Sequence, residues 1–124
     1  MGDLGKFFDR KEVACSDGCG FDSINQILID LLDRMRMFLN EPIHVTSGCR
    51  CEKHNLEVGG FPDSEHLTGD AVDIEIPDSA YRAKVMRFYF FFVGDLPIRM
   101  GIGKNFIHIG VAKDKPQEVV WLYP

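Results

Sequence analysis

The sequence predicts an α+β domain with a mostly antiparallel sheet and two main helices. Residues 24–38 carry apolar side chains at the three- and four-residue spacing of a helix that buries one face. Short runs rich in Val, Ile and aromatic residues follow, most of them in the second half of the chain. The expected order is helix, strand, loop, strand, helix and then three strands, which favours an α+β fold.

Bulk composition is that of one globular domain spanning residues 1–124. The chain has 124 residues, 45% of them hydrophobic and 27% charged, which is ordinary for a soluble protein. A chain of this size buries roughly two-thirds of its unfolded surface, so it folds without a disulfide scaffold. The net charge is −5 and the basic residues are scattered, so we expect no nucleic-acid partner.

The beginning of the chain, M-G-D-L-G-K-F-F-D-R, is charged from its third residue and lacks the apolar segment of a signal peptide. The most apolar run, residues 85–93, is too short to span a bilayer and contains Arg87. We therefore expect synthesis in the cytoplasm and no membrane partner. Action elsewhere would require release by another factor.

The first 21 residues show no regular pattern, and we expect them to be irregular, with Phe7 and Phe8 available to pack down. Asp22 or Ser23 can cap a helix that runs to about Asn40. Its buried stripe would consist of Ile24, Ile27, Leu28, Leu31, Leu32, Met35 and Phe38.

The middle of the chain predicts short elements. Residues 43–47 are expected to form a strand, residues 52–58 a short helical turn and residues 71–76 a second strand. Gly59 to Asp63 form a loop by composition.

The last third predicts one helix and three strands. Ser79 can cap a helix that reaches about Val93. Its aromatic run, residues 88–92, is expected to pack the helix on the sheet and partly on a neighbour. A closing meander would then comprise residues 98–102, 106–111 and 119–123.

Four cysteines occur as two close pairs, Cys15/Cys19 and Cys49/Cys51. An even count is compatible with disulfides, but no secretory signal indicates an oxidising compartment. A structural zinc site is a further alternative, although neither spacing is the C-x2-C that makes such a site a strong prediction. We expect reduced, mostly buried thiols, with a disulfide or structural zinc as the alternatives.

The stretch S-E-H-L-T-G-D-A-V-D, residues 64–73, carries the most chemical information. It contains His66 and Asp73, and a later apolar strand, F-I-H-I-G-V, contains His108. Two His and one Asp form a set of three ligands that leaves the fourth position of a zinc ion open for water. An open position indicates a catalytic metal rather than a structural one.

The phase of the two strands supports this ligand set. Alternation places Asp73 and His108 on the faces opposite the aliphatic residues of their strands. If the strands are neighbours, both side chains meet in one cleft, and His66 reaches it from the preceding loop. Taken singly, a His in a strand is usually a hydrogen-bonded structural residue. His44 and His54 are not accompanied by other ligand-type residues in a matching pattern, so we expect them to be structural or surface residues.

These segments resemble a known family. S-E-H-L-T-G-D-A-V-D resembles the S-x-H-x-x-G-x-A-x-D motif of zinc D-alanyl-D-alanine carboxypeptidases and L-alanyl-D-glutamate endopeptidases, which share the hedgehog/DD-peptidase fold. F-I-H-I-G-V resembles their F-[VI]-H-[VI]-D strand, and S-G-C-R-C-E-K-H-N-L-E-V-G-G-F resembles their S-G-Y-R-x-x-x-x-N-x-x-V-G-G segment. F-D-R-K-E-V-A-C and K-P-Q-E-V-V-W-L-Y are similar to small single-domain members, many of them phage-encoded.

The resemblance implies one zinc ion bound by His66, Asp73 and His108. It implies that Arg50 faces the cleft and pairs with a peptide carboxylate or polarises the scissile carbonyl. Ser64 and Asn55 would position substrate or hold the loop, which Gly59 and Gly60 would shape.

The sequence also departs from the family pattern. The acidic residue or His that many members carry two or three residues before the last ligand is Phe106 or Asn105 here. The Asp expected two residues after that ligand is Gly110, and the Tyr expected beside Arg50 is Cys49. The general base is therefore unassigned.

Glu75 is the first candidate for the base, because it shares a strand face with Asp73. A surface carboxylate on a strand is its alternative reading. Glu65 and Asp70 flank the ligands and are equally compatible with solvent-facing loop charges.

The resemblance implies a hydrolase, a zinc metallopeptidase that cuts D-amino-acid-containing bonds in peptidoglycan stem peptides by carboxypeptidase or endopeptidase action. It would act on the cell wall as a phage-type or bacterial lytic enzyme, as a monomer or weak dimer. The alternative is a non-catalytic zinc-bearing module of the same fold that binds peptidoglycan or protein.

Overall fold

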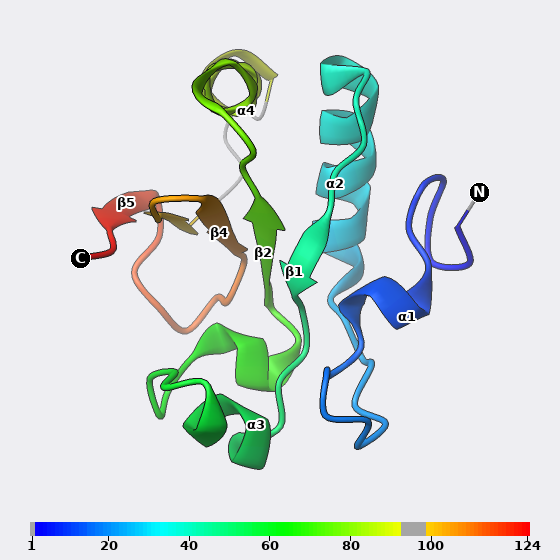
Figure 1. Ribbon diagram of the computed structural model, residues 1–124, viewed down its shortest axis with the longest axis vertical. Helices are drawn as coiled ribbons and strands as arrows, with labels where there is room; N and C mark the ends of the chain where they lie inside the picture. Colours follow the sequence, from blue (N-terminus) through cyan, green and yellow to red (C-terminus); the bar gives the residue numbers. More distant parts are fainter. Residues whose placement is uncertain (1, 93–98) are drawn as a thin grey trace.

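The computed structural model describes residues 2–92 and 99–124 (Figure 1). The predicted helix end at Val93 and strand start at Ile98 therefore lie outside the described residues. Within those residues, helices pack around a mixed sheet of five strands. The predicted α+β class is confirmed.

The sheet consists of short strands in the order β1-β2-β4-β3-β5. Neighbouring strands are antiparallel, except that β3 and β5 are parallel. The strands are β1 (Val45–Ser47), β2 (Ala71–Glu75), β3 (Arg99–Ile102), β4 (Phe106–Gly110) and β5 (Val119–Leu122).

The predicted closing meander is wrong in one respect. β5 lies beside β3 at the edge of the sheet and does not pair with β4. The reason is that β4 already has two partners, β2 on one side and β3 on the other.

The two N-terminal helices begin at side-chain caps. α1 (Arg10–Val13) forms where irregular structure was expected, because Asp9 and Glu12 make a reciprocal capping box. α2 (Gln26–Leu39) begins later than predicted, because Asn25, not Asp22 or Ser23, accepts a hydrogen bond from the Ile27 N–H at 2.9 Å. α2 ends as expected at Asn40, which has a left-handed conformation with φ of 52°.

Three further helical segments complete the fold, α3 (Glu52–Glu57), the 3₁₀ helix η1 (Glu65–Thr68) and α4 (Ser79–Phe92). The cap of α4 is Asp78 and not Ser79, because the Tyr81 N–H donates to Asp78 Oδ1 at 2.8 Å. In the aromatic run, Phe88 is buried against Phe38, whereas Phe90 and Phe91 are exposed. None of the helices in the described part of the chain is long and apolar enough to cross a bilayer.

The core lies between α2 and the aliphatic faces of the central strands. Leu28, Leu32 and Met35 of α2 belong to one buried cluster with residues of β2 and β4. On these strands the buried aliphatic side chains are Val72, Ile74, Ile107 and Ile109, all 0% exposed. Because alternate residues point to opposite faces, this packing turns Asp73 and His108 away from the core.

We expect Ile109→Ala to lower the free energy of unfolding by about 2–5 kcal/mol, because it leaves a cavity in the buried cluster. Val120→Ala is the control, since this β5 side chain is 61% exposed. Urea denaturation followed by circular dichroism measures both variants. Equal effects of the two substitutions would contradict the placement of the core.

Candidate metal centre and cleft

Asp73 is the centre of the predicted ligand set. Asp73 on β2 lies directly opposite His108 on β4 in the antiparallel register, as strand phase predicted. Asp73 Oδ1 lies 3.0 Å from His108 Nδ1 and 3.3 Å from His66 Nε2. The ligand atoms of the three side chains lie within 4.8 Å of one another, so they could hold one metal ion.

The backbone around η1 sets the position of His66. The His66 N–H donates to Ser64 Oγ at 3.2 Å, which caps η1. Gly69 ends η1 with φ of +73°, and a Cβ there would lie 2.0 Å from Ser23 O, so glycine is required. His66 Nδ1 donates to Gly48 O at 2.6 Å, which leaves Nε2 facing Asp73.

Glu65 supplies a second carboxylate, one that sequence reasoning did not assign. It is 3% exposed, so it is not a solvent-facing loop charge. His108 Nε2 donates to its Oε2 at 2.7 Å, and Arg99 Nε and the Ala112 N–H also donate to this carboxylate. Because Nε2 carries the proton, the Nδ1 lone pair of His108 is left to face Asp73 and a metal.

Gly110 makes room for this carboxylate. A Cβ at position 110 would lie 2.0 Å from Glu65 Oε2. Glu65 therefore occupies the space that the Asp expected at position 110 would need. A glycine inside a strand often marks a place where another group lies close to the backbone. Gly110 was therefore the signal available in the sequence for the position of Glu65.

The electrostatics of the site suit a cation. Burial raises the pKa of Asp73, but the imidazoles of His108 and His66 beside its carboxylate outweigh burial and hold that pKa well below its usual range. For Glu65, burial likewise raises the pKa, and the bond from His108 helps to lower it overall. For His108, burial lowers the pKa, and the two carboxylates raise it overall. Both carboxylates are therefore ionised at neutral pH.

A cleft of about 370 Å³ opens at the three ligands. Arg50 lines it, as expected, and burial lowers the pKa of its guanidinium, which stays charged at neutral pH. Arg50 Nε is buried and has no hydrogen-bond partner in the described part of the chain. Tyr123 also lines the cleft, and sequence reasoning did not assign it a role.

The remaining predicted site residues take different places. Ser64 lines the cleft and caps η1. Asn55 is buried and its Nδ2 donates to Phe61 O at 2.8 Å, so it holds the loop. Glu75 is exposed, lies 3.2 Å from His44 Nδ1 and is not among the residues that line the cleft. Asp70 accepts hydrogen bonds from Thr68 in the preceding 3₁₀ helix and from Asn25, the N-cap of α2.

Two imidazoles and a carboxylate beside an open cleft are an arrangement that could hold a catalytic metal ion. A family model described as Peptidase M15 matches residues 6–110, a span that contains all three candidate ligands. The chain therefore belongs to the Peptidase M15 family, and its sheet and helices agree with the predicted hedgehog/DD-peptidase-like fold. No curated protein matches the chain.

We expect Glu65→Gln to weaken metal binding about 10–100-fold, because an amide is a weaker acceptor for the His108 N–H. Asp63→Asn is the matched control, since that neighbouring carboxylate is 85% exposed. Competition with a chromophoric chelator measures the affinity of the His66/Asp73/His108 site for zinc. Unchanged affinity in Glu65→Gln would contradict the orienting role of this carboxylate.

Proposed function

We propose that the chain is a zinc peptidase that hydrolyses D-amino-acid-containing peptide bonds of peptidoglycan stem peptides. The observation that carries the proposal is the His66/Asp73/His108 set in one cleft with the buried Nε of Arg50, which has no hydrogen-bond partner among residues 2–92 and 99–124. Two imidazoles and a carboxylate are a donor set that suits zinc. Membership of a peptidase family supports the reaction class.

The residues divide into those that hold the metal and those that prepare it. His66, Asp73 and His108 would hold the zinc, and when bound it supplies Lewis acidity and a water of lowered pKa. Glu65 and the Gly48 carbonyl orient the two imidazoles from behind.

Arg50 is proposed to bind the substrate. Its planar guanidinium can donate two parallel hydrogen bonds to a carboxylate, the group that ends a stem peptide. It can also stabilise negative charge on the scissile carbonyl oxygen. Gly60 lies close to this side chain, since a Cβ at Gly60 would be 2.9 Å from Arg50 Nη1.

The second candidate function is a non-catalytic module that binds the same peptides. The cleft lining supports this alternative, because the acidic side chain among the described residues that line it is that of Asp73, a ligand, and Glu75 is not among them. Burial raises the pKa of Tyr123, so its hydroxyl is protonated at neutral pH and serves as a donor, not a base. The position of Glu75 outside the cleft therefore does not support its assignment as the general base.

The proposal extends to the setting of the reaction. A small phage-type lytic enzyme, made in the cytoplasm and released to the wall, would meet stem peptides as its partner. Neither nucleic acid nor membrane is required, and a monomer or weak dimer would suffice.

We expect digestion of purified peptidoglycan to release new stem-peptide fragments, which mass spectrometry identifies along with the bond that is cut. His108→Ala should abolish cleavage and lose one equivalent of zinc, whereas His44→Ala, an exposed histidine, should keep both. Zinc binding without cleavage from pH 5 to 9 would identify the binding module. Full zinc retention in His108→Ala would overturn the ligand set.

We expect Arg50→Lys to lower kcat/KM by about 10²–10³-fold while leaving zinc content unchanged, because lysine keeps the charge and loses the planar fork. Arg34→Lys, an exposed change on α2, is the control. Steady-state kinetics on a synthetic stem peptide measures the loss. Wild-type kinetics in Arg50→Lys would place Arg50 outside the reaction.

A further inference from the structure

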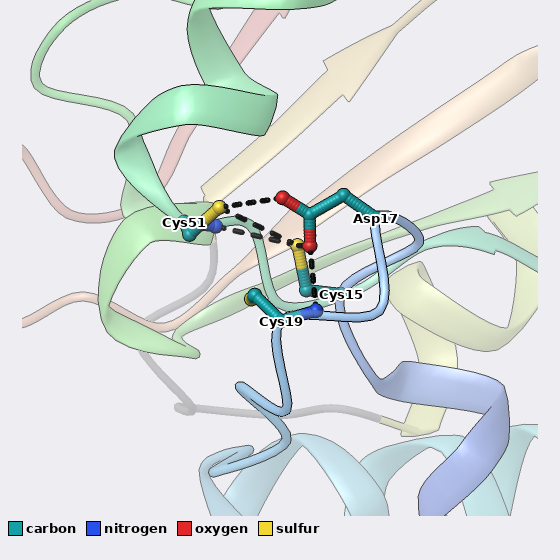
Figure 2. Close-up of side chains that lie close together, drawn as sticks. All are labelled: Cys15, Asp17, Cys19 and Cys51. Carbon is teal, nitrogen blue, oxygen red and sulfur yellow. Dashed lines mark hydrogen bonds between the residues drawn. The ribbon is translucent and has the colours of Figure 1, made fainter.

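A second cluster of metal-ligating side chains lies away from the cleft. Cys15, Asp17 and Cys19 come from the loop after α1, and Cys51 comes from the start of α3 (Figure 2). Their ligand atoms all lie within 4.8 Å of one another. We propose that these three thiols and the carboxylate hold a second zinc ion, with a structural role.

The sulfur–sulfur separation fits a tetrahedral ion. Cys15 Sγ and Cys51 Sγ lie 3.9 Å apart, close to the edge of about 3.8 Å that zinc–sulfur bonds of 2.3 Å produce. A disulfide would need about 2.05 Å. The Asp17 carboxylate lies beside both sulfurs, with Oδ1 3.1 Å from Cys15 Sγ and Oδ2 3.0 Å from Cys51 Sγ (Figure 2). It is therefore placed to serve as the fourth ligand.

Backbone N–H groups point at the sulfurs, as bound thiolates require. The Cys51 N–H donates to Cys15 Sγ at 3.5 Å, and the His54 N–H donates to Cys51 Sγ at 3.4 Å. Such outer hydrogen bonds orient metal ligands and offset their negative charge.

The spacing and the partition of the four cysteines agree with this site. Cys15 and Cys19 are separated by three residues, within the range of structural zinc motifs, and Cys51 completes the set from a distant segment. Cys49 is buried and does not belong to the cluster, although it is only two residues from Cys51. It provides a matched control.

A zinc ion at this site would connect the N-terminal segment to the residues after β1, which include Arg50 of the cleft. The Cys49 N–H donates to Val13 O at 2.8 Å, and the Arg50 N–H donates to His66 O at 3.1 Å. Zinc at Cys51 would therefore hold a segment that contacts both the N-terminal region and a ligand of the cleft.

Metal analysis and cobalt(II) substitution under reducing conditions test the proposal. Wild type should bind two zinc ions per chain, and His108→Ala should retain one. After chelation, added cobalt(II) should give a near-ultraviolet thiolate-to-cobalt charge-transfer band, which the His and Asp ligands of the cleft cannot produce. Cys49→Ser should keep this band and both ions.

Cys51→Ser should lose the charge-transfer band and one zinc ion while the cleft keeps its own. The wild-type and His108→Ala measurements test the site independently of whether the Cys51→Ser variant folds. Absence of the band in wild type, or loss of all zinc in folded His108→Ala, would overturn the site. A Cys15–Cys51 disulfide in the reduced preparation, detected by mass spectrometry after alkylation, would also overturn it.

Discussion

The pairing of β2 with β4 is the constraint on which the site depends. The register sets Asp73 opposite His108, and the same register sets Val72 opposite Ile109 in the core. A slip of one residue would turn the aliphatic side chains outward and the ligands inward. The burial of apolar surface that stabilises the fold therefore also favours the register that brings the metal ligands together.

Residues 48–51 contact parts of the molecule that lie outside the sheet. The Gly48 carbonyl fixes the tautomer of His66, and Arg50 lines the cleft. Cys51 belongs to the second cluster and caps α3. Gly48 also allows a close approach, since a Cβ there would lie 2.4 Å from Val13 O. One short segment thus links the N-terminal region, the ligand loop and the cleft.

The features that the sequence predicted correctly are those that depend on residues close to one another in the chain. Strand alternation placed Asp73 and His108, and apolar spacing found α2 and its buried face, because both depend on neighbours in sequence. The role of Glu65 depends on Arg99 and Ala112, which are 34 and 47 residues away, so no local pattern could reveal its burial. The parallel pairing of β5 depends on which strand edge is free.

The volume shared by Glu65 and Gly110 has a consequence for how the chain can vary. Because a Cβ at position 110 would lie 2.0 Å from Glu65 Oε2, a side chain there would require the carboxylate at position 65 to move from its place beside His108. The effect of a substitution at 110 is therefore expected to depend on the residue at 65. A position-by-position comparison with the family would find that the carboxylate expected at position 110 is missing. The imidazole of His108 nevertheless has a carboxylate partner, which Glu65 supplies.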